Sequence, residues 1–316
     1  MNPYYADDSV TLYHGDARAV SRELASGSAD CIVTSPPYFA LRDYGIDGQF
    51  GLEESPAAYV ETLRALFSGL RRVLSDDGTL WLNLGDTYNN AAAGQTLESA
   101  KGRRSTLPDR HLAAKSLLGI PWRVAFALQA DGWILRMDNV WAKRNFMPEP
   151  VKDRPTRAHE YVFLFSKTER YWYDSEAIRE DSDPGQVAHN QRYAKVYPAQ
   201  ADRAATTGQP GNSNSAGIHS RPGRPGRNAR SVWWISAQPF AQAHFAVMPL
   251  ELAERCVMAG CKRGGVVLDP FSGSGTTGLA AAKHGRRYVG VDLNADYLDL
   301  SLKTRLHQSA IDFGGA

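Results

Sequence analysis

The 316-residue sequence contains 36 Lys and Arg residues and 34 Asp and Glu residues, a formal net charge of +2, and 43% of it is hydrophobic. This composition excludes a wholly disordered chain, and no apolar run approaches the roughly 20 residues that a membrane helix needs. Three cysteines are too few for a disulfide framework or a four-ligand zinc site, and the amino-terminal residues lack a basic-then-apolar signal, so we expect a cytoplasmic location.

The small net charge conceals an uneven distribution along the chain. Residues 101–157 carry a net charge of +7 and residues 181–230 carry +4, so the rest of the chain carries −9. Two basic regions on an acidic body are typical of a protein with one surface that faces a polyanion. Unevenly charged solvated surface gives the same pattern, and charge alone leaves both interpretations open.

The first half of the chain predicts alternating strands and helices. From Val10 onward we expect a strand, a helix closed by Gly27, a strand at 31–34 stopped by two prolines, a helix at 57–74, a turn at 75–78, a strand at 79–86, a helix at 121–132, and strands at 133–143 and 159–168. Only a proline-bearing loop joins the last two strands, which favours an antiparallel pair at a sheet edge.

Residues 181–230 interrupt this alternation. They contain 5 Pro and 6 Gly but only five residues from the set Val, Ile, Leu, Met, Phe, Tyr and Trp, so the segment buries too little to fold independently and predicts a mobile insert. Its end places four arginines three residues apart: Arg221, Arg224, Arg227 and Arg230. A flexible linker with incidental arginines and an arm that contacts phosphates are both consistent with this pattern.

The carboxyl-terminal block predicts a βαβ unit, in which a helix within 249–265 precedes a strand at 266–269, a glycine-rich turn, a helix at 276–285, a strand at 287–292 and a terminal helix. The turn lies where a doubly wound sheet binds ligands, and Gly273 and Gly275 allow the backbone to approach one closely. It matches neither a Walker loop nor the dinucleotide fingerprint. Asp292 ends the second strand, where it can hold a ribose diol, so the unit favours a nucleoside ligand over a merely tight turn.

A second motif, Thr34-Ser35-Pro36-Pro37-Tyr38, ends the strand at 31–34. Two prolines stiffen the backbone and leave the Pro36 carbonyl without a helix or sheet partner. Ser35 adds a hydroxyl and Tyr38 adds a flat ring. Two acceptors beside an aromatic face suit the exocyclic amino group of a base, although a stiff loop with a surface tyrosine is the simpler alternative.

These motifs, in this order, resemble the amino-group DNA methyltransferases of the permuted beta arrangement. The resemblance covers segments 15–17, 30–38, 79–86, 132–143, 154–167, 244–277 and 289–292. It implies a Rossmann-like, S-adenosylmethionine-dependent methyltransferase fold with circularly permuted motif order: a mostly parallel α/β sheet with an antiparallel edge pair. Residues 1–180 would form the target-side half of one catalytic domain, 181–230 a basic target-recognition insert, and 231–316 the cofactor-binding half.

The resemblance also implies roles for individual residues on the cofactor side. Residues 244–249 would close the pocket against the methionine moiety of S-adenosylmethionine. The other expected cofactor contacts are Asp269, Phe271, Gly273 and Gly275 at the methionine end, Thr276 and Thr277 at the helix start, Asp292 at the ribose and Asp16 near the adenine.

On the target side, the resemblance implies a flipped base held by Ser35, Pro36, Pro37 and Tyr38. Serine at the position of Ser35 usually accompanies methylation of cytosine N4 in this family, so we expect a site-specific cytosine-N4 DNA methyltransferase. Adenine N6 is the alternative. An RNA or protein amide methyltransferase and a catalytically silent DNA-binding module are less favoured, because the serine, the motif order and the basic insert point to DNA and both motifs are intact.

The expected partner is double-stranded DNA, and no His or Cys spacing predicts a metal site. The sequence leaves open whether a cognate restriction endonuclease accompanies the enzyme and whether it is a monomer or a homodimer. The expected DNA contacts are Arg103, Arg104, Arg221, Arg224, Arg227 and Arg230.

Overall fold

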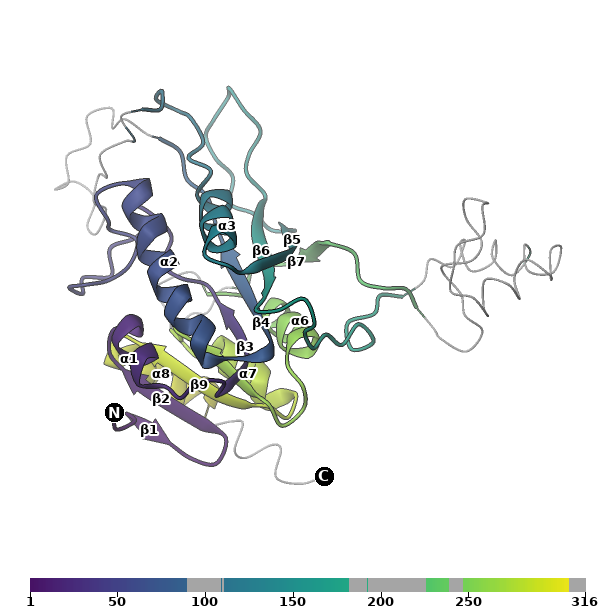
Figure 1. Cartoon of the computed structure of the whole chain (residues 1–316). Coiled ribbons are helices and arrows are strands. Elements are labelled where there is room, and N and C mark those ends of the chain that lie inside the picture. Colours follow the sequence, from purple (N-terminus) through teal and green to yellow (C-terminus); the bar gives the residue numbers. More distant parts are fainter. Residues whose placement is uncertain (90–108, 110, 182–191, 193–225, 239–246, 307–316) are drawn as a thin grey trace. The chain divides into compact units, whose positions relative to one another are not determined.

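The computed structural model describes residues 1–89, 109, 111–181, 192, 226–238 and 247–306 (Figure 1). The chain divides into two compact units, one formed by residues 1–174 with 231–316 and the other by residues 175–230. None of the described helices is long and apolar enough to span a bilayer.

A single mixed sheet organises the first unit. Among the described residues it has nine strands in the order β1-β2-β9-β8-β3-β4-β6-β5-β7. Their bounds are β1 Tyr5–Ala6, β2 Val10–His14, β3 Ala29–Thr34, β4 Leu74–Leu84, β5 Ile134–Lys143, β6 His159–Ser166, β7 Val232–Ile235, β8 Val266–Asp269 and β9 Arg287–Asp292.

The strand directions confirm a mostly parallel α/β fold. Strands β2, β9, β8, β3 and β4 pair in parallel, whereas β6 runs antiparallel to both β4 and β5. The antiparallel pair is therefore present, but β7 adds in parallel beside β5 and forms the edge strand on that side of the sheet, opposite β1. Alternate residues of β7 face opposite sides, so Trp233 is buried whereas Trp234 is 60% exposed.

Helices cover both faces of this sheet, with α1, α2 and α3 on one side and α6 and α7 on the other (Figure 1). In α2, Ser55 caps the amino terminus, Pro56 occupies the first turn, and the apolar stripe from Tyr59 to Val73 is buried. The helix bounds are α1 Ala17–Glu23, α2 Pro56–Val73, α3 Ile120–Ala130, α6 Leu250–Gly260, α7 Thr276–Lys283 and α8 Ala295–Ser301, which continues as a π-helical turn at Leu302–Leu306.

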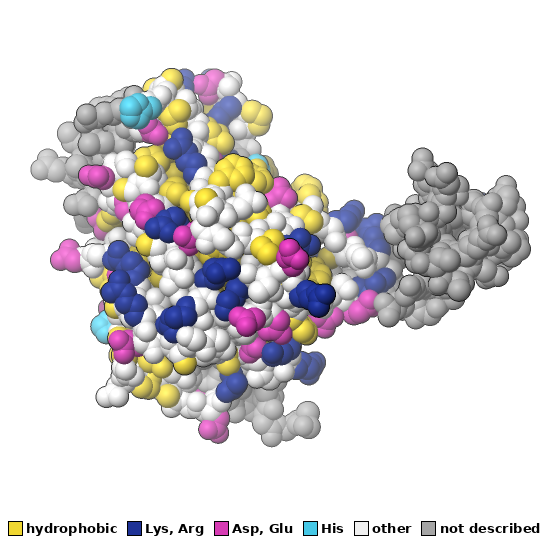
Figure 2. Space-filling model, in the orientation of Figure 1, with side chains coloured by type: hydrophobic (Ala, Val, Ile, Leu, Met, Phe, Trp, Pro, Cys, Tyr) yellow, Lys and Arg dark blue, Asp and Glu magenta, His cyan; other side chains and the backbone are white. Residues whose placement is uncertain are grey.

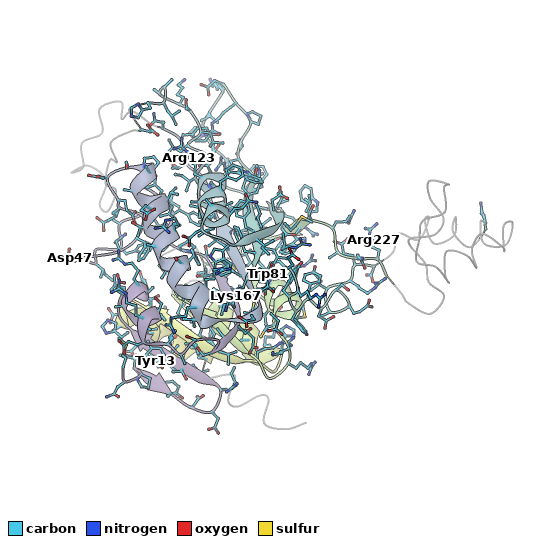
Figure 3. The ribbon with its side chains drawn as sticks, viewed as in Figure 1. Tyr13, Asp47, Trp81, Arg123, Lys167 and Arg227 are labelled. Carbon is cyan, nitrogen blue, oxygen red and sulfur yellow. The ribbon has the colours of Figure 1, made fainter. Side chains whose placement is uncertain are left out.

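The turn expected at residues 75–78 is absorbed into β4. Ala29 pairs with Leu74 and Cys31 pairs with Thr79, so β4 has extra residues between two steps of β3 and bulges there. Beyond the bulge, Trp81 is buried at the centre of the sheet (Figure 3), where it packs against Trp233.

The second unit contains the whole 181–230 segment, of which the structure describes residues 181, 192 and 226–230. Glu180 and Arg227 form a backbone bridge within it. The mobility expected for this segment stays a prediction.

Candidate active site

The strand order creates a ligand-binding position between β8 and β3. From β8 the chain passes through α7 to β9 on one side, and from β3 it passes through α2 to β4 on the other. Adjacent parallel strands whose connections leave in opposite directions open a crevice beyond their carboxyl ends. Functional side chains are therefore expected at this edge of the sheet.

A cavity of about 520 Å³ lies at this edge, a volume typical of small-molecule sites. Loop residues 15–17, 35–38, 269–274 and 292–294, which follow β2, β3, β8 and β9, line it. Of the twelve residues singled out individually for cofactor or target roles, all but Gly275 line this cavity, and of the segment 244–249 the described residues Val247 and Met248 line it. Gly275 instead caps α7 in the left-handed conformation, with φ at +78°.

Asp269 ends β8 and points into a buried hydrogen-bond network. Its Oδ1 accepts hydrogen bonds from the Thr34 hydroxyl at 2.6 Å and from the Phe271 backbone N–H at 3.0 Å. Only 3% of Asp269 is exposed, and this burial raises the pKa of its carboxyl to about 6. Asp269 therefore joins the ends of β3 and β8 and places a carboxyl in the wall of the cavity.

Asp292 occupies the corresponding place at the end of β9. Its two carboxylate oxygens accept the backbone N–H groups of Gly273 at 2.7 Å and Asn294 at 2.8 Å. Burial raises the pKa of this carboxyl as well. Each oxygen keeps a further lone pair for a ligand in the cavity, which is the arrangement that binding a ribose diol requires.

Aromatic rings supply apolar parts of the cavity wall. Phe271 packs edge-on against Phe50, with ring centroids 5.0 Å apart. Tyr44 and Tyr297 also line the cavity and lie edge to face at 6.5 Å. The sequence singled out only Phe271 of these four, because the others come from a loop and a terminal helix without a recognisable motif.

Asp16 lines the cavity, but its carboxylate already has local partners. It caps α1 by accepting the N–H groups of Arg18 and Ala19, and it pairs with the Arg18 side chain at 2.8 Å. These bonds fix the carboxylate at the cavity rim. Its expected contact with adenine stays a prediction, as do the expected roles of Thr276 and Thr277, which are buried at the start of α7.

On the target side, residues 35–38 form a stiff loop held by buried neighbours. The Tyr59 hydroxyl donates to the Pro37 carbonyl at 2.8 Å. The Tyr38 ring packs directly on Gly85, where an added Cβ would lie 2.5 Å from the ring. No described residue donates a hydrogen bond to the Pro36 carbonyl, which therefore stays available as an acceptor.

Three polar residues behind Tyr38 were not anticipated from the sequence. The Tyr38 hydroxyl donates to Glu160 at 2.6 Å, and Glu160 also accepts from Asn83 at 3.1 Å and from Lys143. The available signal was an acidic residue at the start of the otherwise apolar β6. This acidic residue can be assigned to the site only from the structure, in which the antiparallel direction of β6 places its first residues beside the ends of β3 and β4.

Two of the six expected DNA-binding arginines lie within the described residues. Arg103, Arg104, Arg221 and Arg224 lie outside the described residues, as does His244. Within the second unit, the side chains of Arg227 and Arg230 contact the Glu180 carboxylate at 3.4 and 2.8 Å. On the face of the molecule drawn in Figure 2, described basic side chains are interspersed with acidic ones.

Comparisons with known proteins agree with this geometry. The Type II methyltransferase M.Cfr9I of Citrobacter freundii is 45% identical over 300 residues, which cover 93% of this chain and 87% of the relative. The solved PvuII DNA methyltransferase, described as cytosine-N4-specific, has a TM-score of 0.62 at 20% identity and covers 95% of this chain and 87% of its own.

A second solved structure, the M1.HpyAVI–SAM complex, has a TM-score of 0.51 at 18% identity and covers 93% of this chain and 98% of its own. Both structures show the fold. A model of the N6/N4 methyltransferase family, described as DNA methylase, matches residues 29–303, which include the cavity-lining loops after β3, β8 and β9. This chain therefore belongs to the N6/N4 family of DNA methylases.

Proposed function

We propose that this chain transfers a methyl group from S-adenosylmethionine to the exocyclic N4 amine of a flipped cytosine at a specific site in double-stranded DNA. One observation carries the proposal: residues 35–38 and the glycine turn after β8 line the same cavity. A methyl donor and an acceptor base must meet within bonding distance, and a shared cavity allows this without a large rearrangement.

The donor set of the cavity fits S-adenosylmethionine. Asp269 and Asp292 provide two carboxylates, which suit a cationic ligand that also has a ribose diol, and the rings of Phe50, Phe271 and Tyr297 provide flat apolar walls for a base. Gly273, with φ at +50°, keeps the turn compact and lets the backbone approach the ligand. When bound, this cofactor supplies an electrophilic methyl group. The SAM complex of M1.HpyAVI, a protein of the same fold, supports this assignment.

On the target side, the residues of the loop would make the amine reactive. The lone pair of an exocyclic amine is delocalised into the ring, which makes it a weak nucleophile. Ser35 and Pro36 line the cavity, and Ser35 Oγ and the Pro36 carbonyl would accept the two amino hydrogens, which favours a pyramidal nitrogen with a localised lone pair. Tyr38 would stack on the extruded base and exclude water from it.

Cytosine is favoured over adenine by Ser35, because serine at this position usually accompanies N4 methylation in the family that the motifs resemble. The cytosine-N4-specific PvuII enzyme has the same fold. Site specificity would come from the 181–230 segment, with Arg221, Arg224, Arg227 and Arg230 contacting DNA. A Type II relative at 45% identity supports a role in a restriction-modification system, with an endonuclease that reads the same site.

Methyl transfer to DNA, followed by nucleoside analysis, tests the proposal. Full-length protein, labelled S-adenosylmethionine and double-stranded DNA should yield N4-methylcytosine, and a Ser35→Ala variant should lose most of this activity. N6-methyladenine as the product would replace cytosine with adenine as the target. Transfer to RNA or protein with none to DNA would refute the proposed substrate. Single-molecule sequencing of the modified DNA would then identify the recognition site.

A further inference from the structure

Glu160 is the meeting point of three hydrogen-bond donors behind the target pocket. Its Oε2 accepts from the Tyr38 hydroxyl at 2.6 Å and from the Asn83 amide at 3.1 Å, and its Oε1 accepts from the Lys143 ammonium. The Glu160 side chain is only 12% exposed. Because an ionised carboxylate can only accept hydrogen bonds, it satisfies all three donors at once.

This arrangement determines the direction of a short hydrogen-bond chain. Tyr38 has one hydroxyl proton, and the short bond to Glu160 uses it. The Tyr38 oxygen can then only accept, and Ser35 Oγ donates to it across 3.3 Å. This second bond is long, as is common for catalytic hydrogen bonds before substrate binds. The proton of Ser35 thus points toward Tyr38, and the lone pairs of Ser35 Oγ remain for the cavity.

The direction matters for the chemistry of the target amine. An amine nitrogen attacks through its lone pair, so a serine that donated a proton to that nitrogen would oppose the reaction. A serine that accepts a hydrogen bond from the amine favours the attack instead. Through two successive hydrogen bonds, by way of Tyr38, the Glu160 carboxylate thus keeps Ser35 Oγ in the accepting orientation. Lys143, which also lies 4.6 Å from the centre of the Trp141 ring, holds the negative charge in place.

We infer that Glu160 is a positioning residue which, through Tyr38, orients the Ser35 hydroxyl so that Ser35 Oγ accepts a hydrogen bond from the target amine. The inference rests on the proposed function, because it assigns a purpose to the acceptor geometry of the target loop. Glu160 itself does not contact the reacting atoms in this role.

Glu160→Gln is the primary test, because it preserves shape while removing the charge. Whichever way the new amide turns, its NH2 group faces either Lys143 or the pair Tyr38 and Asn83, all of which are donors. With the NH2 group toward Tyr38, the hydrogen-bond chain from Ser35 is reversed or broken; with it toward Lys143, Tyr38 keeps an acceptor that has lost its charge, which weakens the chain. We expect kcat to fall by at least roughly tenfold. Calorimetry should give a dissociation constant for S-adenosylmethionine within about twofold of wild type, because Glu160 acts on the target side.

Glu254→Gln in α6 provides a matched control. Glu254 is also a partly buried glutamate in an ion pair, with Lys283 at 2.7 Å, but it does not line the cavity. The inference requires Glu254→Gln to retain wild-type kcat within about twofold. An equal fall of kcat in both glutamine variants would show a general effect of lost charge and would overturn it.

Tyr38→Phe tests the route through the hydroxyl without altering Glu160, and a double-mutant cycle with Glu160→Gln tests whether the two residues act together. Tyr38→Phe alone should lower kcat, because it removes the hydroxyl that links Glu160 to Ser35. Adding Glu160→Gln should then lower kcat little further. An undiminished further fall would mean that Glu160 acts by another route. The proposed function fails separately, if the wild-type protein transfers no methyl group to DNA.

Discussion

Replacing Asp269 by asparagine should stabilise the protein in the absence of cofactor and weaken its binding of S-adenosylmethionine. Burial raises the pKa of the Asp269 carboxyl from 3.8 to about 6. At pH 7 the native state therefore holds a buried negative charge, which water would solvate in the unfolded chain. A shift of this size corresponds to about 3 kcal/mol of lost stability at pH 7. Asparagine keeps an oxygen for the Thr34 hydroxyl and the Phe271 N–H.

The pH dependence follows from the direction of this shift. Because the native state binds the proton more tightly than the unfolded chain, the stability due to the neutral carboxyl is fully present below about pH 4. It is lost as the pH rises through about 6. Asparagine does not titrate, so the gain in melting temperature of Asp269→Asn should be largest at pH 7, at roughly 5 °C, and should narrow toward pH 4.5.

Thermal unfolding of the cofactor-free protein between pH 4.5 and 7.5 measures this effect, and calorimetry measures cofactor affinity. Asp86→Asn is a suitable control, because Asp86 is a largely buried carboxylate that caps α3 through Gly119 and Ile120, and its loss should lower the melting temperature. Melting temperatures of wild type and Asp269→Asn that change in parallel over this range would refute the reasoning.

Three further predictions follow from close contacts and charge. Gly275→Ala should lower the free energy of unfolding by about 1–3 kcal/mol in denaturant titrations, because a Cβ there meets Ser301 Cβ at 2.9 Å and φ is +78°. Gly285→Ala, with positive φ but no atom within 4 Å, should cost less; an equal cost would contradict the steric argument. Gly85→Ala should displace the Tyr38 ring and reduce methyl transfer more than cofactor binding, whereas equal losses would contradict a target-side role. DNA affinity should fall as salt rises in fluorescence anisotropy, and a salt-independent affinity would exclude phosphate contacts.

Local patterns predicted the parts of the site that lie close together in sequence. The glycine turn between β8 and α7, and Asp292 at the end of β9, belong to one βαβ unit whose geometry follows from strand and helix periods and from glycine conformation. The loop at 35–38 was equally predictable from the sequence, because two prolines stop a buried strand there. In these segments the residues that carry the chemistry lie within a few positions of a strand end.

Contacts between residues that are distant in sequence could not be predicted from local patterns. Thr34 and Asp269 form a 2.6 Å hydrogen bond although they are 235 residues apart, because β3 and β8 are neighbours in the sheet. The contact of Glu160 with Tyr38 depends on the antiparallel direction of β6, and a parallel strand would have placed its first residues at the opposite edge.

The sequence by itself thus determined the strand ends, the turn chemistry and the family resemblance, all of which are properties of short segments. Only the tertiary structure decided which strand ends meet, that β7 rather than β5 forms the edge strand beside the antiparallel pair, and that a carboxylate lies behind the target loop. The physical reason is that strand order and direction arise from burying the faces of the whole sheet, which no local pattern specifies.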